Sequence, residues 1–450
     1  MNDHHSHTGT DHGTADRSRM RILWPDHMGL ARGKYLPTWR RGEGTGFCVT
    51  TFAMGYDRDL IDAPGGHLLG GLKDVYGTPD PASIRPSWEN DATVVAVADL
   101  QLGGAPYEVS SRRALQRSLA AWKDLGHDVK VGIELEGYLL APTPQDPYAK
   151  YSNPRSMVYG TGPLGDPSGF VGDVLDTADR CGFAVESANV EFDESQFEFT
   201  LRYDDALRAV DDAFLFRLMV REIAISKGLD FTFLGKPFPT VSGSGVHTNF
   251  SLVDANGANV MFDASDEHGL STVARSCLAG LVEHHRALTA IGAPTVNSYR
   301  RLQPGSLAGC WANWGVDHRN VANRVPAETG SSMRIESRIG DGSMNLHLGV
   351  AAVLEAARLG VSAGAVPGDA YVGDGFEDGG PGAVRGALSL SAALDDLEAD
   401  TAFVAAFDAE LIGNFLANKR HESERSTATG ESFDGDTLTE FEVTNYLPYH

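Results

Sequence analysis

The stretch that most constrains this chain is VGIELEGYLL, residues 131–140. Its apolar residues are typical of a buried β-strand, and side chains two apart on a strand point to the same face. Glu134 and Glu136 therefore share one face, while Ile133 and Leu135 point to the other. Two carboxylates in such surroundings repel each other and resist removal from water. Either a solvated sheet face or a bound cation would explain this pair.

A second acidic cluster is VEFDESQFEF, residues 190–199. A tight turn at Glu194–Ser195 would set Glu191 directly opposite Glu198 on the two strands of a hairpin. Like charges directly opposite are destabilising, and a divalent cation between them would reverse that sign. Together with the first pair, four carboxylates then lie on sheet faces. Hard oxygen ligands of this kind suit Mg²⁺ or Mn²⁺.

The stretch VSGSGVHTNFSL adds a histidine next to a glycine-rich loop. Its Ser-Gly-Ser-Gly run lets the backbone approach a ligand closely. His247 and Asn249 follow on one face of the next strand. A lone histidine is more often a structural residue than a ligand, and its place beside the loop narrows that margin.

The stretch SSMRIESRI alternates arginine and glutamate. Glu336 lies between Arg334 and Arg338 on one strand face, either in a salt-bridge ladder or as a metal ligand flanked by anion clamps. Arginine forks suit carboxylate and phosphate. Four further arginines lie upstream: Arg300, Arg301, Arg319 and Arg324.

The charge of the chain limits its partners. Its 450 residues carry a formal net charge of −24, which repels nucleic acid and anionic membranes, so we expect neither as a main partner. No apolar run has the 18 residues that indicate a transmembrane helix. The four cysteines lack metal-ligand spacing and predict reduced thiols in a cytoplasmic protein. The His-rich start, residues 1–18, could bind metal, but its composition favours a disordered tail, and it has no secretory signal.

The order of the predicted elements favours an α+β fold. Residues 19–106 contain short apolar stretches separated by Gly and Pro, which predict a small β-rich domain. From 107 to 450, strands and helices alternate and several strands look like hairpins, which favours a largely antiparallel sheet. We expect strands over LDFTFLGKPF, GVHTNFSLVDA and SSMRIESRI. We expect helices over GFVGDVLDTADRCG, DDALRAVDDAFLFRLMVREIAISKG, STVARSCLAGLVEHHRALTAI, LHLGVAAVLEAARLGVSAG and FVAAFDAELIGNFLANKRHESER.

The motifs that the sequence lacks narrow its chemistry. It has no phosphate-binding P-loop and no serine nucleophile elbow, and no Cys-His or Ser-His pair stands at a recognisable spacing. Glutamates, one histidine and several arginines remain. This inventory favours phosphoryl transfer by metals and arginines, without a covalent nucleophile.

Taken in order, these motifs resemble the glutamine synthetase family over nearly the whole chain from about Arg21. Glu134-Leu135-Glu136 resembles its ExE metal strand, and the stretch from Glu191 to Glu198 resembles its paired metal carboxylates. GSGVH resembles its GSGxH loop, and NSYRRLQPG, HRNVANRVP and RIESRIGDGSMNLHL resemble three further segments. RGKYLP matches the N-terminal domain and NYLP the C-terminus.

The resemblance implies a β-grasp N-terminal domain and a catalytic domain with a curved antiparallel sheet backed by helices. It also implies stacked rings of subunits, with active sites between neighbouring subunits. In the family, ATP phosphorylates the γ-carboxylate of L-glutamate with the help of Mg²⁺ or Mn²⁺. An amine then displaces phosphate.

The resemblance also implies roles for single residues. One metal would be held by Glu136, Glu191 and Glu198. The second, nearer the ATP phosphates, would be held by Glu134, His247 and Glu336. Glutamate would be bound by Gly243, Arg301 and Arg338. The phosphates and the transferring phosphoryl group would meet Arg319, Arg324 and Arg334. The nucleotide would contact Glu186, Asn249 and Ser251.

Departures from the family pattern concern the nucleophile. Members that use ammonia carry a Glu where this chain has Leu307, and an Asp where this chain has GFCVTTFAM, which contains Cys48 and no carboxylate. A less polar pocket favours an alkyl or aryl amine over NH₄⁺. Tyr159 and the carboxylates near the metal are candidates to take the proton of the amine. Smaller departures are Asn249 where a His is usual and Ser242 where an Asn is usual.

The leading hypothesis is an ATP-dependent ligase that joins the γ-carboxylate of glutamate to a small organic amine through γ-glutamyl phosphate. The first alternative is an ammonia-dependent glutamine synthetase. The second is a catalytically silent relative that acts as a regulator. Every metal position is filled, which argues against the silent relative.

Overall fold

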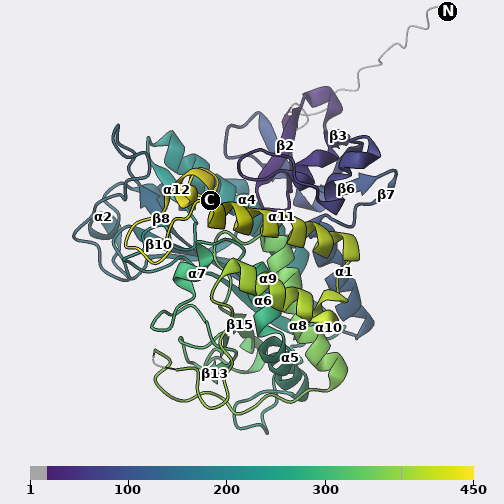
Figure 1. Ribbon diagram of the computed structural model, residues 1–450, viewed down its shortest axis with the longest axis vertical. Helices are drawn as coiled ribbons and strands as arrows, with labels where there is room; N and C mark the ends of the chain where they lie inside the picture. Colours follow the sequence, from purple (N-terminus) through teal and green to yellow (C-terminus); the bar gives the residue numbers. More distant parts are fainter. Residues whose placement is uncertain (1–17, 377) are drawn as a thin grey trace, which may run out of the picture.

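A computed structural model describes residues 18–376 and 378–450. Two sheets organise these residues, and Figure 1 shows the smaller N-terminal sheet, in purple, set apart from the rest of the chain. The predicted His-rich tail lies outside the described residues, except for Ser18.

The first sheet has seven strands in the order β2-β1-β6-β4-β3, and β5 and β7 both pair with β6. Only β1 and β6 run parallel; the other pairs are antiparallel. The strands are β1 (Arg19–Pro25), β2 (Ala31–Leu36), β3 (Thr45–Cys48), β4 (Asp74–Pro79), β5 (Arg85–Pro86), β6 (Thr93–Leu102) and β7 (Ala105–Pro106). Because this sheet ends at Pro106, we propose to keep the domain boundary there.

The second sheet has eight strands in the order β13-β14-β15-β12-β8-β10-β9, and β11 pairs with β8. The strands are β8 (Asp128–Leu140), β9 (Val185–Val190), β10 (Gln196–Asp205), β11 (Asp230–Thr232), β12 (Val246–Val253), β13 (Trp314–Val316), β14 (Asn323–Val325) and β15 (Ile335–Ser337). All pairs except β13–β14 are antiparallel. The prediction of a largely antiparallel sheet is therefore confirmed.

Helices α1 (Ser111–Asp124), α3 (Phe170–Cys181) and α4 (Ala206–Ser226) pack against the second sheet, and most of the other helices pack on helices rather than on this sheet. The other longer ones are α5 (Thr272–Glu283), α6 (His285–Gly292), α8 (Leu346–Ala363), α9 (Leu390–Ala399) and α11 (Ala409–Ala428). The short ones are α2 (Gly162–Gly165), α7 (Ser298–Arg301), α10 (Thr401–Val404) and α12 (Glu440–Asn445). Between α3 and the sheet, Phe170 stacks on Phe231 with ring centroids 5.3 Å apart. This aromatic layer fixes the sheet from behind and leaves its other face for polar side chains.

One helix of the described residues, α8, is long and apolar enough by length and composition to cross a membrane. It is 72% buried inside the protein and packs against α1 and α5. These contacts are those of a core helix.

Two predicted helices are divided in the structure. The helix expected over STVARSCLAGLVEHHRALTAI breaks at His284, whose ring lies 2.6 Å from Asp400 and stacks on Phe403. The helix expected over FVAAFDAELIGNFLANKRHESER becomes α10 and α11, because Asp408 caps the start of α11 by accepting from the Glu410 backbone. The strand expected over LDFTFLGKPF shrinks to the three residues of β11.

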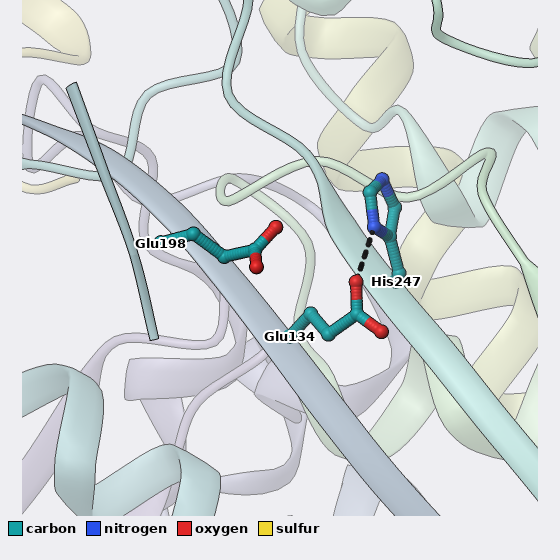
Figure 2. Close-up of side chains that lie close together, drawn as sticks. All are labelled: Glu134, Glu198 and His247. Atoms are coloured by element: carbon teal, nitrogen blue, oxygen red, sulfur yellow. Dashed lines mark hydrogen bonds and ion pairs between the residues drawn. The ribbon is translucent and has the colours of Figure 1, made fainter. Parts of the chain in front are cut away.

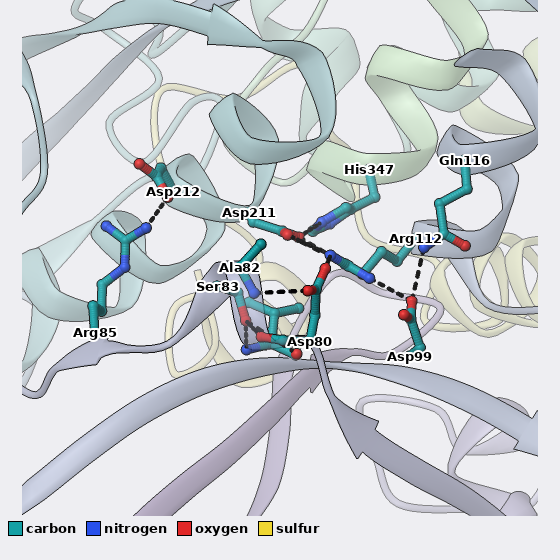
Figure 3. A network of polar contacts seen from close by, with 11 residues as sticks. Asp80, Ala82, Ser83, Arg85, Asp99, Arg112, Gln116, Asp211, Asp212 and His347 are labelled. Atoms are coloured by element: carbon teal, nitrogen blue, oxygen red, sulfur yellow. Dashed lines mark hydrogen bonds and ion pairs between the residues drawn. The ribbon is translucent and has the colours of Figure 1, made fainter. Parts of the chain in front are cut away.

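A buried ionic network joins the two parts of the chain (Figure 3). Arg112 at the start of α1 is 1% exposed and donates to Asp211 of α4, to Asp80 and to Asp99. His347 of α8 also hydrogen-bonds Asp211, at 2.8 Å. Asp80 and Asp99 belong to the first sheet region, so a single guanidinium ties that sheet to the helices behind the second one.

Candidate active site

Glu134 and Glu136 share one face of the central strand β8, as the alternation predicted. Ile133 and Leu135 point to the other face and are almost fully buried, at 1% and 0% exposed. The two carboxylates instead face a polar strip that the neighbouring strands complete.

Side chains from three adjacent strands converge on this strip (Figure 2). His247 on β12 is directly opposite Glu134, and its Nδ1 lies 2.9 Å from Glu134 Oε2. Glu198 on β10 is directly opposite Glu136. One ligand atom each of Glu134, Glu198 and His247 lie within 4.8 Å of one another. Such a group can share one cation, and it draws on both of the predicted metal sets.

Glu336 reaches the same strip from β15, on the other side of β12. It is 1% exposed, and its Oε1 lies 3.5 Å from His247 Nδ1. Arg324 donates to its Oε2 at 2.9 Å and Arg338 to its Oε1. Burial opposes ionisation of this carboxyl, but Arg338 and His247 outweigh it and lower the pKa of Glu336. It therefore stays ionised and able to ligate a metal.

The acidic strip carries more negative charge than its protein surroundings balance. Burial, with Glu134 the first of the repelling neighbours, raises the pKa of Glu198 to about 9. Burial and Glu136 likewise raise the pKa of Glu191. Burial opposes ionisation of Glu134 too, but His247 overcomes it and the pKa of Glu134 is about 2. A divalent cation would restore the charged form of the raised carboxylates, and the donor set of carboxylates with one imidazole fits Mg²⁺ or Mn²⁺.

The predicted pairing of Glu191 with Glu198 is wrong. Glu198 pairs with Asn189, and the backbone N–H of Glu191 donates to Gln196. The loop between β9 and β10 is wider than a tight turn because Ser195 adopts a left-handed conformation and its hydroxyl donates to Tyr151. The register differs from the predicted one by two residues, so the side chains keep their faces. Asn189 Nδ2 accordingly reaches Glu191 Oε1 at 3.2 Å.

Arg301 lies beneath the glycine-rich loop. It is 4% exposed, and its Nη1 and Nη2 donate at 3.1 Å to the carbonyls of Ile339 and Arg338. Among the described residues, no carboxylate lies within ion-pair distance of it. A Cβ on Gly243 would stand 2.8 Å from Arg301 Cγ, and one on Gly245 2.8 Å from its Nη2. The loop therefore needs glycine there, and a buried positive charge remains for an anionic ligand.

The other predicted phosphate-binding arginines line the outer part of the strip. Arg324 bridges Glu336 and Asp317, at 2.9 and 2.6 Å. Arg334 donates from Nε to Asn249 Oδ1 at 3.2 Å. Arg319 is exposed beside them.

The predicted nucleotide contacts lie on two strands of this sheet. Asn249 and Ser251 share one face of β12, and Ser251 pairs with Lys130 of β8. Glu186 is exposed on β9, which lies across β10 and β8 from them.

Three predicted residues are not brought into the strip. Tyr159 is 66% exposed and left-handed, with φ of 61°, and its N–H donates to Val190. Cys48 ends β3 in the first sheet and contacts Thr50. Leu307 is 45% exposed, and its carbonyl lies 3.5 Å from Arg338 Nη2.

Sequence reasoning missed two residues that shape the site. Gln196 donates to the Gly243 carbonyl at 2.9 Å and so holds the glycine-rich loop; its place between two acidic residues of one motif was the available signal. Asp317 holds Arg324 and has a φ of 47°, which is uncommon for a non-glycine residue. No feature of the sequence alone singled it out.

Comparison with known proteins decides the family. Residues 108–437 match the sequence model of the glutamine synthetase catalytic domain. The chain belongs to the glutamine synthetase family. Members of this family are ATP-dependent glutamate ligases, so the protein is a carbon–nitrogen ligase.

Relatives with different nucleophiles match the chain about equally well. A glutamine synthetase of Halobacterium salinarum is 33% identical over 82% of this chain and 83% of its own. A glutamate–isopropylamine ligase of a Pseudomonas species is 31% identical over 69% and 71%. A gamma-glutamylethanolamide synthetase of Streptomyces coelicolor is 31% identical over 78% and 79%.

Solved structures confirm the fold. A GmaS/ADP complex superposes with a TM-score of 0.82 and 27% identity over 95% of this chain and 96% of its own. An apo GmaS superposes with a TM-score of 0.81 and 28% identity over 94% and 95%. The expectation of a glutamine-synthetase-type catalytic fold is thereby confirmed.

Proposed function

We propose that this ligase joins the γ-carboxylate of L-glutamate to a small organic amine. One observation carries the proposal: a connected cluster is formed by Glu134, His247, Glu336, Arg324 and Arg338, while the two positions linked to ammonium hold the uncharged Leu307 and Cys48. The chain therefore combines a family-type phosphoryl-transfer site with a changed nucleophile pocket.

The reaction would run in two balanced steps. A γ-carboxylate oxygen of glutamate attacks the γ-phosphorus of ATP, ADP leaves, and γ-glutamyl phosphate forms. The amine nitrogen then attacks the acyl carbon, phosphate leaves, and the nitrogen loses a proton. The carboxylates of the strip are the candidates to receive that proton, and Tyr159 is a candidate to assist its transfer.

Metal ligation would use both sides of the strip. One cation, Mg²⁺ or Mn²⁺, would be held by Glu136, Glu191 and Glu198. The other would be held by Glu134, His247 and Glu336. Bound there, the cations would neutralise the phosphate charge that develops during transfer. The close approach of Glu134, Glu198 and His247 supports a cation in the strip, and it joins members of both sets.

Different arginines would bind different anionic groups of the substrates. Arg301, Arg338 and the Gly243 backbone would bind glutamate, and the burial of Arg301 supports this role. Arg319, Arg324 and Arg334 would meet the phosphates of ATP. The nucleotide would contact Glu186, Asn249 and Ser251.

An apolar pocket would bind an alkylamine more tightly than ammonium, because ammonium loses more favourable hydration on entering it. Ammonium is small, charged and strongly hydrated, so a pocket without carboxylates holds it poorly. Each buried CH₂ of an alkylamine contributes about 0.8 kcal/mol. Two or three such groups would favour the alkylamine roughly tenfold or more.

Release of phosphate with glutamate, ATP and a panel of amines that includes ammonium tests the proposal, with the amide product identified by mass. Leu307→Glu should raise ammonium use and depress use of bulky amines. Leu388→Glu, at a position 59% exposed, is the matched control and should change neither. The proposal fails if the native protein makes glutamine from ammonium faster than any γ-glutamylamide.

Ammonia-dependent glutamine synthesis is the second candidate, because the Halobacterium salinarum relative is a glutamine synthetase. The same amine panel separates the two functions. A preference for ammonium over every organic amine would establish this second function.

We further propose that the chain works as stacked rings in the cytoplasm. Two aromatic side chains are exposed in the single chain, Tyr35 of β2 at 56% and Trp39 just after β2 at 78%, and a neighbouring subunit would cover them. The four cysteines are free thiols, which supports a reducing compartment.

A further inference from the structure

Asn249 lies at the centre of the polar strip, between strands β8 and β15. It is directly opposite Gly132 on one side and Glu336 on the other. Its side chain is 8% exposed. Nδ2 donates to Glu134 Oε1 at 2.9 Å, and Oδ1 accepts from Arg334 Nε at 3.2 Å. A single amide therefore connects a carboxylate of the metal group with an arginine of the phosphate group.

The chemistry of the two partners fixes the orientation of this amide. A carboxylate only accepts hydrogen bonds and a guanidinium only donates them. The NH₂ end must therefore face Glu134 and the oxygen must face Arg334. A flipped amide would put two acceptors together and two donors together, so the surroundings hold one orientation.

The two contacts leave the other functional atoms of their partners available. Glu134 Oε2 faces His247 at 2.9 Å, on the side where the metal group converges. Arg334 uses Nε for Asn249, and Nη1 for the Ser332 carbonyl at 3.3 Å and for an ion pair with Glu328 at 3.4 Å. Its Nη2 has no hydrogen-bond partner within residues 18–376 and 378–450, so Arg334 can still donate to a ligand.

We propose that Asn249, besides its proposed contact with the nucleotide, is a positioning residue that couples metal binding at Glu134 to phosphate binding at Arg334. The inference rests on the proposed function, because it takes Glu134 as a metal ligand and Arg334 as a phosphate ligand. Metal ligands depend on such outer hydrogen bonds for their orientation. Here the outer bond continues to a second binding group, so a change at either end is transmitted through one rigid amide.

Asparagine suits this role better than a protonated histidine would. An amide donates and accepts at any pH, whereas an imidazolium donates from both nitrogens and cannot accept from Arg334. An imidazolium would also place a positive charge beside the guanidinium. The amide thus keeps the link intact without adding charge between the two sites.

The experiment compares the native protein with Asn249→Leu, whose side chain has the same branching but makes neither hydrogen bond. Calorimetry measures Mn²⁺ binding without nucleotide and ADP binding with saturating Mn²⁺. ADP binding is then measured again for Arg334→Gln and for the variant that carries both Asn249→Leu and Arg334→Gln. Thr248→Val is the matched control, because Thr248 is buried on the same strand and faces the other way. Asn249→Ser replaces the leucine variant if that protein does not fold.

Asn249→Leu should weaken Mn²⁺ binding about 10-fold to 100-fold. It should also weaken ADP binding in the native background and have little further effect once Arg334 is replaced. An unchanged Mn²⁺ affinity, purely additive effects on ADP, or an equal loss in Thr248→Val would each overturn the proposal. A native protein that binds neither Mn²⁺ nor ADP would overturn the proposed function as well. A protein that binds both but makes no γ-glutamylamide would overturn only the proposed function.

Discussion

At the scale of a single residue, Glu198 lowers the stability of the folded protein without a cation, and it is a proposed ligand of that cation. Its carboxylate is buried beside Glu134, Glu136 and Glu191, and burial with these charges raises its pKa to about 9. Without a cation the four groups repel one another. With a cation among them, each contributes attraction instead.

Glu198→Gln should therefore leave the protein at least as stable as the native one in EDTA, and weaken Mn²⁺ binding by about tenfold or more. Thermal unfolding in EDTA and calorimetric titration with Mn²⁺ measure the two effects. Asp205→Asn, on the same strand but 72% exposed in its side chain, should change neither. A Glu198→Gln protein that is clearly less stable in EDTA would contradict the repulsion argument.

Arg301→Lys tests whether the buried guanidinium binds substrate as a fork. Lysine keeps the charge but loses the planar pair of donors, and one lost charge-assisted hydrogen bond is worth roughly 1.5–3 kcal/mol. The KM for glutamate should rise about 10-fold to 100-fold in steady-state kinetics. Arg300→Lys is the control, because Arg300 binds Glu442 instead; it should keep the native KM. Equal KM values for both variants would make Arg301 a structural residue only.

At the scale of elements, the sequence predicts those features that depend on local periodicity, such as the face of a strand on which a side chain lies. The alternation in β8 places Glu134 and Glu136 on one face because strand geometry repeats every two residues. The register of β9 against β10 was mispredicted because Ser195 and Glu194 bind residues of another segment, Tyr151 and Ser152. A turn that is set by such tertiary contacts leaves no local signal.

The break between α5 and α6 is likewise set by a tertiary contact, with a residue still further away in the sequence. Nothing in STVARSCLAGLVEHHRALTAI marks a break, yet His284 leaves the helix path to meet Asp400, 116 residues further along. The sequence predicts which side chains are candidates for the site, and it does not predict their geometry. Motifs specify which side chains are present. The distances between those side chains depend on how the eight strands of the second sheet pair with one another.

The ion pairs of Arg112 should contribute to the stability of the protein, because they join the first sheet to the helices. Arg112→Leu would leave Asp211 buried without a cationic partner, which costs about 3–5 kcal/mol of stability. Urea unfolding should show this loss. Arg113→Leu, the neighbouring residue, removes only a partly exposed pair with Glu108 and should cost less than about 1 kcal/mol. Similar midpoints for both variants would show that the network contributes no more than a surface ion pair.

At the scale of the whole molecule, buried neutral histidines make stability depend on pH. Burial lowers the pKa of His285 and of His27 to about 4, from an ordinary value of 6.5. Between these two values the unfolded chain binds more protons than the folded one. The contribution of these two histidines to stability is therefore greatest above the ordinary value, and it falls as the pH drops through this window by up to about 1.4 kcal/mol per pH unit for each histidine.

His285→Gln removes one of these two titrating groups. Urea unfolding across the same pH window should then show a slope that is smaller by up to about 1.4 kcal/mol per pH unit. Above the window the two proteins should respond alike to pH. A slope as steep as that of the native protein would mean that His285 is protonated in the folded state.

The proposed amine pocket raises a question about the assembly. Cys48 ends β3 of the first sheet, and Leu307 follows α7 beside Arg338. Figure 1 shows β3 and α7 in different regions of the chain. In a ring, the first sheet of one subunit can instead lie beside the second sheet of the next, so that each pocket would need two chains.

Complementation between two inactive variants tests this arrangement. Cys48→Arg should block the pocket with a large charged side chain, and Glu191→Ala should remove a proposed metal ligand. In mixed oligomers, some sites would combine the native first sheet of one variant with the native second sheet of the other. Random pairing makes about one quarter of the sites native, so co-expressed and doubly tagged oligomers should recover about that share of activity. A mixture of Glu136→Ala with Glu191→Ala should stay inactive, because both changes lie in the same sheet. Mixed oligomers of the first pair that are no more active than this control would place each active site within a single chain.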